Sequence, residues 1–304
     1  MKVVFLGTSG TFPTIGRNVT SHGVWVKGET LLLDCGEGTQ RQLRRTSLRF
    51  FVHRIFLSHL HGDHILGLPG YIWSMDLLGR TEPLSLYIPA RSRRMIEAMI
   101  GGIGKLGYPV HITELDDGMS VPLPGYRVIA ARVEHSGHCC LGFRIEEESR
   151  LGKVDVEKAR ALGIPPGPNI GKLIRGESVE VNGVVVMPEQ VVGPARDGRV
   201  VVYSGDTKPC NALKTLAKGA DLLLHESSFS NALADEAKSR AHSTAQGAAS
   251  IAAEAMVKRL ALTHISQRHQ DEEGIRTLLS EARQVFPQSF LPYDLDEVEL
   301  ALPE

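Results

Sequence analysis

Four side chains that can bind a metal ion lie within one six-residue stretch: His59, His61, Asp63 and His64. The stretch follows an apolar run over 55–57, which is typical of a short buried strand. In α/β proteins, ligand sites lie at the ends of strands, on the loop edge of the sheet. Imidazole nitrogens and a carboxylate oxygen suit Zn²⁺, although Fe and Mn also accept such ligands. The non-functional alternative is a solvated loop rich in histidine.

The spacing of these four side chains favours more than one metal ion. Four ligands so close in sequence are hard to arrange around one tetrahedral ion, whereas two ions about 3.5–4 Å apart can share them. We therefore predict a binuclear site.

Three more candidate ligands follow apolar, strand-like runs elsewhere in the chain. His135 comes after the run 128–131, Asp206 after 200–203, and His264 after 260–263. Gly205 precedes Asp206 and permits a tight turn. Each of these residues alone could be a capping or turn residue. Together they predict a metal site in which the Asp206 carboxylate can bridge two cations.

The elements that must position these residues alternate between strand-like and helix-like patterns, which favours an α/β fold. Early strands are predicted over 3–6, 23–26 and 30–33, followed by a helix that carries Gln40 and Arg41. Helices are predicted over 69–80 and 91–101, with a strand over 84–88 between them. In the second half, strands are predicted over 200–203, 221–224 and 260–263, and helices over 212–218 and 245–258. Residues 150–199 differ: a short helix is expected within 153–162 and a strand over 184–187, and a Pro- and Gly-rich turn between such small elements can bury little core.

The metal motif resembles that of the metallo-β-lactamase superfamily, and three further segments resemble the ribonuclease Z family within it. These segments are 7–18 at the start of the chain, 162–173 in the Pro/Gly-rich region, and the pair 225–227 and 242–244. The resemblance spans essentially the whole chain. It implies a four-layer αββα sandwich formed by one domain over 1–304, with an inserted, protruding tRNA-binding arm over 150–199.

The resemblance also implies an activity: a zinc-dependent endoribonuclease that removes the 3′ trailer from precursor tRNA. The tRNA would keep a 3′-hydroxyl and the trailer a 5′-phosphate. Two Zn²⁺ ions per chain are expected. One would be held by His59, His61 and His135, and the other by Asp63, His64 and His264, with Asp206 between them.

The resemblance further assigns roles to individual residues. Asp63 would accept a proton from the attacking water, and His242 would give one to the leaving oxygen, as an imidazole can near neutral pH. Apart from the resemblance, Glu226 is expected to orient either His242 or the loop beside the metals. The residues expected to contact RNA are Arg17, Asn18, Gly167, Pro168 and Lys172. Ile15 stands where the family often has lysine, so the response to an encoded CCA end is not predicted.

Composition fits a globular enzyme, with 42% hydrophobic and 23% charged residues. No apolar run approaches the roughly 20 residues needed to cross a bilayer, so no membrane contact is expected. The four cysteines form no C-x-x-C motif, which favours free thiols and a cytoplasmic location. The expected partners are precursor tRNA and a second copy of the chain, in a homodimer, and DNA is not expected.

The net charge of −1 gives no global attraction to nucleic acid. Local clusters could compensate. Arg41, Arg44 and Arg45 form one, and Arg91, Arg93 and Arg94 form another. Either cluster could equally be the solvated face of a helix. Five histidines match no predicted ligand position and are expected to be surface or packing residues: His22, His53, His111, His138 and His269.

Two other functions stay open from the sequence. A metal-dependent phosphodiesterase acting on small esters would use the same ligands but would have no need for a tRNA-binding arm. An RNA-binding protein without catalysis would have no need for two metal ions and a proton donor.

Overall fold

The computed structural model describes residues 1–302 except 103, 136 and 138, so His138 lies outside the described residues. The chain divides into two compact units. The large unit contains 1–146 and 200–301, and the small unit contains 147–199. The break at 147 and 199 lies close to the bounds 150–199 that the Pro/Gly-rich composition predicts.

Two seven-stranded sheets form the centre of the large unit. The first has the order β16-β1-β2-β3-β4-β5-β6 and the second the order β15-β14-β13-β12-β9-β8-β7. In the first sheet the strands are β16 (Glu297–Glu299), β1 (Lys2–Gly7), β2 (Ser21–Val26), β3 (Glu29–Leu33), β4 (Arg54–Phe56), β5 (Leu84–Pro89) and β6 (Val110–Leu115). In the second they are β15 (Ser289–Phe290), β14 (Leu260–Thr263), β13 (Leu222–Glu226), β12 (Val200–Tyr203), β9 (Leu141–Glu147), β8 (Tyr126–Arg132) and β7 (Ser120–Leu123).

Both sheets mix parallel and antiparallel pairs in the same way. Strands β3 to β6 pair in parallel in the first sheet, as β12 to β15 do in the second. Antiparallel pairs complete each sheet, for example β1 with β2 and β12 with β9. The carboxyl ends of the parallel strands therefore gather at one edge of each sheet, where ligand sites are common.

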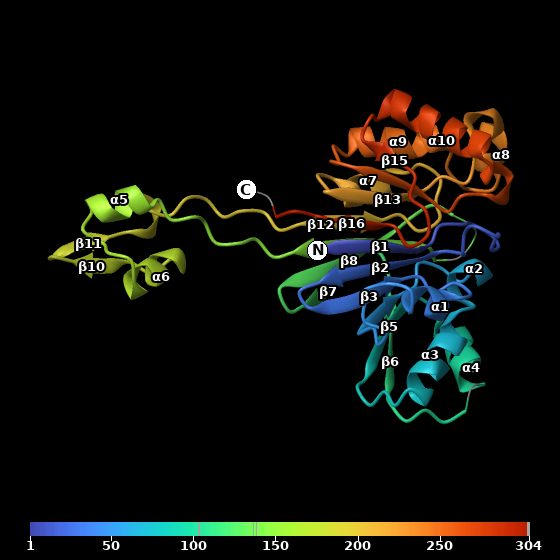
Figure 1. The fold of residues 1–304 in the computed structure, drawn as a ribbon, viewed down its shortest axis with the longest axis horizontal. Coiled ribbons are helices and arrows are strands. Elements are labelled where there is room, and N and C mark those ends of the chain that lie inside the picture. The colour runs from blue at the N-terminus through green and yellow to red at the C-terminus, as the bar shows by residue number, and fades with distance from the viewer. Residues whose placement is uncertain (103, 136, 138, 303–304) are drawn as a thin grey trace. The chain divides into compact units, whose positions relative to one another are not determined.

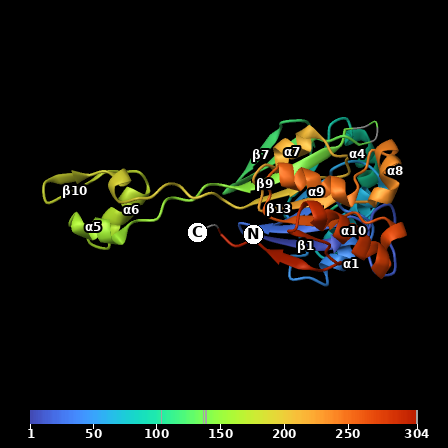
Figure 2. The ribbon, with the colours of Figure 1, turned by 90° about the horizontal axis from the view of Figure 1, so that it is seen from above.

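Helices cover the outer faces of the two sheets (Figure 1). The first sheet carries α1 (Thr39–Leu43), α2 (Gly62–Ile65), α3 (Leu68–Leu77) and α4 (Arg93–Gly101). The second carries α7 (Asn211–Ala217), α8 (Ala234–Ser239), α9 (Ala245–Glu254) and α10 (Glu272–Val285). The view turned by 90° shows α9 and α10 above β1 and β13 (Figure 2). This is the four-layer αββα arrangement of the metallo-β-lactamase fold that the family resemblance implies.

Three apolar cores hold these layers together. One lies between the sheets, where Phe5 and Leu31 of the first sheet join Phe143 and Val201 of the second. The other two lie between each sheet and its helices. Since fully burying a large apolar side chain contributes roughly 1.5–3 kcal/mol, these cores fix the sheet edges on which the site depends.

The small unit has a core of its own. Its elements are α5 (Val156–Ala161), α6 (Pro168–Ile174), β10 (Val179–Val181) and β11 (Val184–Val186). Six buried residues pack between them: Ala159, Ile164, Leu173, Val179, Val186 and Val191. Strand β11 falls within the predicted strand 184–187, and α5 within the predicted helix 153–162.

The predicted strands and helices named above each correspond to an observed element, with ends shifted by a few residues. The largest omission is α10, although Ile275, Leu278 and Ala282 recur on one face of it at helical spacing. The β6, β7, β9 and α6 segments also went unpredicted. None of the described helices is long and apolar enough to cross a membrane.

Candidate metal centre

The seven predicted metal ligands converge at the strand ends. They fall into overlapping groups whose ligand atoms lie within 4.8 Å of one another: His59, His61, His135 and Asp206 in one, and Asp63, His64 and His264 in another. A third group contains Asp206, His264 and His242. Asp206 belongs to two of these groups, so its carboxylate lies where a bridging ligand would.

The Asp206 carboxylate is the centre of this cluster. Its Oδ2 atom lies 3.2 Å from Nε2 of His264 and 3.4 Å from Nε2 of His64. The Nε2 atoms of His59 and His135 lie 3.7 and 3.9 Å away. Asp206 follows Gly205. Glycine suits this position for two reasons: its φ of 59° is in the left-handed region, and a Cβ there would lie 2.7 Å from the carbonyl oxygen of Leu141.

Four of the histidines are held by their Nδ1 atoms. His59 Nδ1 lies 3.0 Å from Ser58 Oγ, and His64 Nδ1 donates to Asp34 Oδ2 over 2.7 Å. His135 Nδ1 lies 3.0 Å from the carbonyl oxygen of Ala241, and His264 Nδ1 lies 2.8 Å from Ser228 Oγ. Such outer partners fix the ring orientation and leave Nε2 available for a metal.

Asp34 is the most heavily used of these outer partners. Its buried carboxylate accepts from the backbone N–H and the hydroxyl of Ser58, from His64 and from the hydroxyl of Tyr203. Asp34 therefore ties β3 and the His59–His64 motif to the opposite sheet. Sequence analysis did not single it out. The signal was present, because Asp34 follows the strand 30–33 as the ligands follow theirs.

Asp63 lies on the open side of the cluster. Its Oδ2 atom lies 3.2 Å from His264 Nε2 and 3.5 Å from His64 Nε2. The backbone N–H of Thr11, in the opening loop, donates to the same oxygen over 2.7 Å. The opening loop also packs closely on His264, since a Cβ on Gly10 would lie 2.4 Å from that ring. The start of the chain thus helps to place Asp63.

His242 lies beside the cluster, with its ring centre 4.6 Å from that of His135 and 5.6 Å from that of His264. Its Nδ1 donates to Glu226 Oε1 over 2.7 Å. Glu226 is buried and also accepts from the N–H of Thr207 and from the N–H and hydroxyl of Ser228. Burial lowers the pKa of His242, but the Glu226 carboxylate outweighs this effect and raises that pKa to about 9. The orienting role predicted for Glu226 agrees with this contact.

The donor set fits a metal better than it fits the protein alone. In the described part of the chain, Asp206 Oδ1 and the Nε2 atoms of His59 and His64 are buried without a hydrogen bond. Leaving such a group unpaired costs about 1–3 kcal/mol. Burial raises the pKa of Asp206, but the nearby histidines hold it well below its usual range. An ionised carboxylate surrounded by imidazole nitrogens is a suitable ligand set for a divalent cation.

The residues predicted to contact RNA differ in their exposure and lie in both units. Arg17 is only 3% exposed, donates to Thr8 Oγ1 and to the carbonyl of Pro292, and lies 4.5 Å from the ring of Tyr293. An RNA contact was expected there, but the guanidinium instead holds the opening loop to the C-terminal segment. Asn18 donates to the carbonyl of Glu37 over 2.7 Å. Gly167, Pro168 and Lys172 lie in the small unit and are exposed.

Four of the five unassigned histidines lie within the described residues, and none of these four belongs to the metal groups. His22 is fully buried between Phe5 and Tyr203. His225 is also buried outside these groups, with its Nδ1 against the carbonyl of Glu226.

Comparison with known proteins agrees with this geometry. A family model described as anti-Pycsar protein Apyc1 matches residues 1–135, less than half of the chain. The crystal structure of the short form of human tRNase Z is similar, with a TM-score of 0.71 and 26% identity over 99% of this chain and 100% of that one. The metallo-β-lactamase fold protein YhfI from Bacillus subtilis has a TM-score of 0.70 at 18% identity, over 98% of each chain, which is a likeness of fold. Fold and site together define a metal-dependent hydrolase of the metallo-β-lactamase fold.

Curated relatives narrow this class to a family. Ribonuclease Z of Methanosarcina mazei is 45% identical over 99% of this chain and 98% of its own length. Ribonuclease Z of Natronomonas pharaonis is 44% identical over 100% and 99%. The chain belongs to the ribonuclease Z family of tRNA 3′-processing endonucleases.

Proposed function

We propose that the enzyme uses two zinc ions to cut precursor tRNA on the 3′ side, leaving a 3′-hydroxyl on the tRNA and a 5′-phosphate on the trailer. The observation that supports two ions is the position of Asp206. Its carboxylate belongs to the group with His59, His61 and His135, and its Oδ2 atom also lies 3.2 Å from His264 Nε2 and 3.4 Å from His64 Nε2, two of the ligands proposed for the second ion. Nitrogen and carboxylate donors without a thiolate suit zinc.

The proposed chemistry divides between the two sides of the cluster. Bound zinc would supply positive charge to the phosphoryl oxygens and would acidify a water molecule. Asp63, on the open side of the cluster, is proposed to accept the proton of the attacking water. His242 is proposed to donate a proton to the departing 3′-oxygen of the tRNA, because Glu226 fixes its Nδ1 and leaves Nε2 to act. Glu226 is thus a positioning residue.

The small unit is proposed to bind the tRNA far from the scissile bond. It presents Gly167, Pro168 and Lys172 on its exposed surface, and Lys172 carries a positive charge that suits a phosphate. Phosphate contacts of this kind position a substrate without reading its sequence. The residues 162–173 that resemble the ribonuclease Z arm run from the end of α5 into α6.

A homodimer is proposed on the basis of exposed apolar residues on and just before α3. Trp73 and Leu77 are 53% and 70% exposed and lie four residues apart on one face of α3, and Leu66, 59% exposed, lies between α2 and α3. Exposed apolar patches often mark contacts between subunits, and two-fold dimers are the commonest assembly. Trp73→Asp should convert a dimer to a monomer in analytical ultracentrifugation. A wild-type protein that sediments as a monomer would contradict the proposal.

The location proposed for the enzyme is the cytoplasm, where its tRNA substrate is processed. The four free cysteines agree with a reducing compartment.

The function is tested by incubating zinc-loaded protein with a precursor tRNA carrying a 3′ trailer and by mapping both new ends. The expected products are tRNA with a 3′-hydroxyl and trailer with a 5′-phosphate, and a chelator should abolish the reaction. Hydrolysis of a small chromogenic phosphodiester without cleavage of precursor tRNA would instead favour the small-ester phosphodiesterase.

A further inference from the structure

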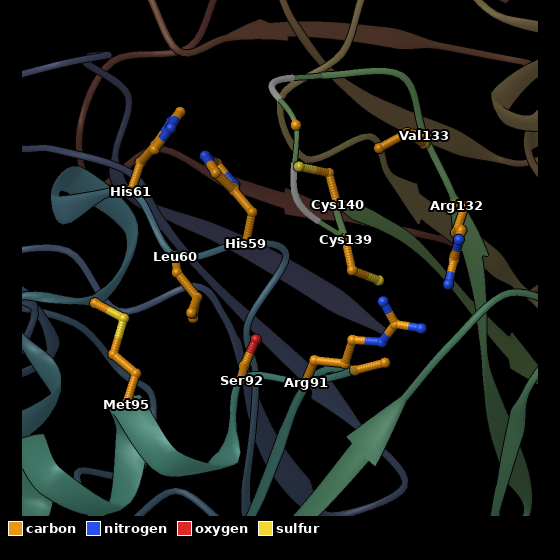
Figure 3. A pocket seen from close by; sticks show the side chains of 12 residues that line it. His59, Leu60, His61, Arg91, Ser92, Met95, Arg132, Val133, Cys139 and Cys140 are labelled. Atoms are coloured by element: carbon orange, nitrogen blue, oxygen red, sulfur yellow. The ribbon is translucent and has the colours of Figure 1, made fainter.

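A cavity of about 650 Å³ opens beside the metal centre. Its wall includes the candidate ligands His59 and His61 on one side and Arg91 and Arg132 on the other, and Leu60 and Met95 lie below the two histidines (Figure 3). The volume lies in the range of small-molecule sites. His242 is not part of this wall, so the proposed proton donor does not border the cavity.

The order of side chains across the centre supports that separation. The ring of His242 packs on His135, and His135 Nε2 lies 3.3 Å from His61 Nδ1. His61 in turn borders the cavity. A path from the proton donor to the cavity therefore crosses the ligand group of one metal.

Arg91 gives the cavity a positive charge that is not neutralised. Arg132 forms a two-pronged ion pair with Asp116, at 2.5 and 2.7 Å. Within the described residues, no carboxylate forms an ion pair with Arg91, although its charge lowers the pKa of Asp116 after the larger effect of Arg132. In Figure 3 the Arg91 guanidinium lies below Cys139, and Arg132 lies to the right of Cys139. Of these two arginines, Arg91 is therefore the one whose guanidinium has no carboxylate partner among the described residues.

The backbone holds Arg91 in an unusual conformation. Its φ is 67°, which is uncommon for a residue other than glycine and costs of order 1–3 kcal/mol. The neighbours fix this loop, because the N–H of Ala90 donates to the carbonyl of Leu115 and the N–H groups of Ser92 and Arg93 donate to Glu114. Such outliers persist where the surroundings enforce them, and they cluster at ligand sites.

We propose that this cavity is a subsite for the first nucleotide of the trailer, with Arg91 binding the phosphate on its 3′ side. The inference rests on the proposed function, in which His242 protonates the 3′-oxygen of the tRNA. The nucleotide on the 5′-phosphate side of the cut must then leave the metal centre away from His242, toward the cavity. Leu60 and Met95 offer an apolar wall that accepts any base, so the subsite selects for a phosphate and not for a sequence.

The product side of the proposed reaction suggests a direct probe. A nucleoside 3′,5′-bisphosphate carries the 5′-phosphate of the product and the next phosphate of the trailer. It should inhibit hydrolysis of a chromogenic phosphodiester about tenfold more strongly than the matching nucleoside 5′-monophosphate, as expected for one charge-assisted contact. This comparison needs only the metal-dependent hydrolase activity.

Substitution of Arg91 distinguishes a contact between Arg91 and the second phosphate of the inhibitor from a general attraction of phosphate to the metal ions. Asparagine tolerates positive φ, so Arg91→Asn removes the guanidinium without straining the loop. The advantage of the bisphosphate should fall to less than about twofold, because the charged contact is lost. Arg91→Lys should retain most of it. Arg94→Asn is the matched control, because Arg94 is a neighbouring exposed arginine outside the cavity wall, and it should leave the advantage intact.

A second experiment uses precursor tRNA with a trailer of a single nucleotide, ending in either a 3′-hydroxyl or a 3′-phosphate. The 3′-phosphate should raise kcat/KM in the wild type and in Arg94→Asn, but not in Arg91→Asn. Equal inhibition of the wild type by the two nucleotides, or an advantage that survives in Arg91→Asn, would overturn the subsite. Failure to cleave any precursor tRNA, with the bisphosphate advantage present, would instead count against the proposed function and leave the subsite supported.

Discussion

The large and small units hold their functional residues in opposite ways. In the large unit, Asp206 and His64 are buried, and each candidate ligand is approached by several other groups. In the small unit, Gly167 and Pro168 are exposed at the start of the seven-residue helix α6 and Lys172 is exposed in its last turn, over a core of six buried residues. The candidate ligands of the large unit are thus held in place by many contacts, whereas the candidate RNA-binding residues of the small unit are exposed to solvent.

This difference follows from what each unit is proposed to do. A metal centre that handles a phosphoryl group needs atoms placed to within a few tenths of an ångström, and hydrogen-bonded neighbours provide that precision. A unit that holds a large, folded RNA needs charge and shape at its surface instead. We therefore expect damage to the first region to affect every substrate and damage to the second to affect only precursor tRNA.

The largest effect is expected from Asp206→Ala, which removes the carboxylate at the centre of the cluster. Both metals should be lost or weakened, because four Nε2 atoms would then surround an empty position. Activity toward precursor tRNA and toward a chromogenic phosphodiester should fall by roughly 10³-fold or more. Metal analysis should show fewer than two ions per chain. A variant that keeps two ions and full activity would contradict the bridging role.

The next effect is expected from His242→Ala, with a loss of roughly 10²–10⁴-fold in the cleavage of precursor tRNA. The metal content should stay the same, since His242 is proposed as a proton donor and not as a ligand. Glu226→Gln should give a smaller loss by weakening the hold on Nδ1. The pH profile of kcat/KM should also change in that variant, which a purely structural role would not predict. Unchanged turnover of His242→Ala would remove this residue from the mechanism.

A third prediction removes most of the small unit. Val154 and Val192 pair in antiparallel fashion, so residues 155–191 can be replaced by an Asn-Gly turn that closes a hairpin. Cleavage of precursor tRNA should fall on the order of 10²-fold through weaker positioning. Metal content and hydrolysis of the chromogenic phosphodiester should be retained. A shortened protein that still processes precursor tRNA normally would show that the small unit has no role in substrate binding.

A smaller effect is expected from Asp34→Asn, which keeps the shape of the side chain but removes the charge that orients His64. Metal affinity should fall roughly 10–100-fold, as for other groups that hold a metal-binding histidine. The measurement is competition for zinc with a chelator of known affinity. Excess zinc should restore most of the activity, in contrast to Asp206→Ala.

The smallest effect on catalysis is expected from Leu173→Ala in the core of the small unit. The substitution should lower the stability of the small unit by about 2–5 kcal/mol, which is a large loss for a core of six buried residues. Hydrogen exchange should accelerate over 147–199 and stay the same in the large unit, and the chromogenic phosphodiester should be hydrolysed at the wild-type rate. Leu162→Ala, at a partly exposed position, is the matched control. Faster exchange throughout the large unit would contradict the independence of the two units.

The sequence alone determined the candidate ligands, because their chemistry is local. Histidine and aspartate placed directly after apolar runs can be recognised without coordinates, and those seven side chains do converge. The alternation of strand-like and helix-like patterns predicted the α/β class, whereas the four αββα layers were expected only from the resemblance to the metallo-β-lactamase superfamily.

Only the tertiary structure decided which polar residues hold the ligands and which face outward. Asp34 follows a strand as the ligands do, but its sequence position does not show that it holds them, since its four hydrogen bonds come from Ser58, His64 and Tyr203, which are far from it along the chain. Arg17 and Arg91 are both arginines near glycine or turn residues, yet one is buried against Tyr293 and the other lines a cavity. The burial and partners of a side chain depend on segments that meet only when the sheets pack, so no local pattern encodes them.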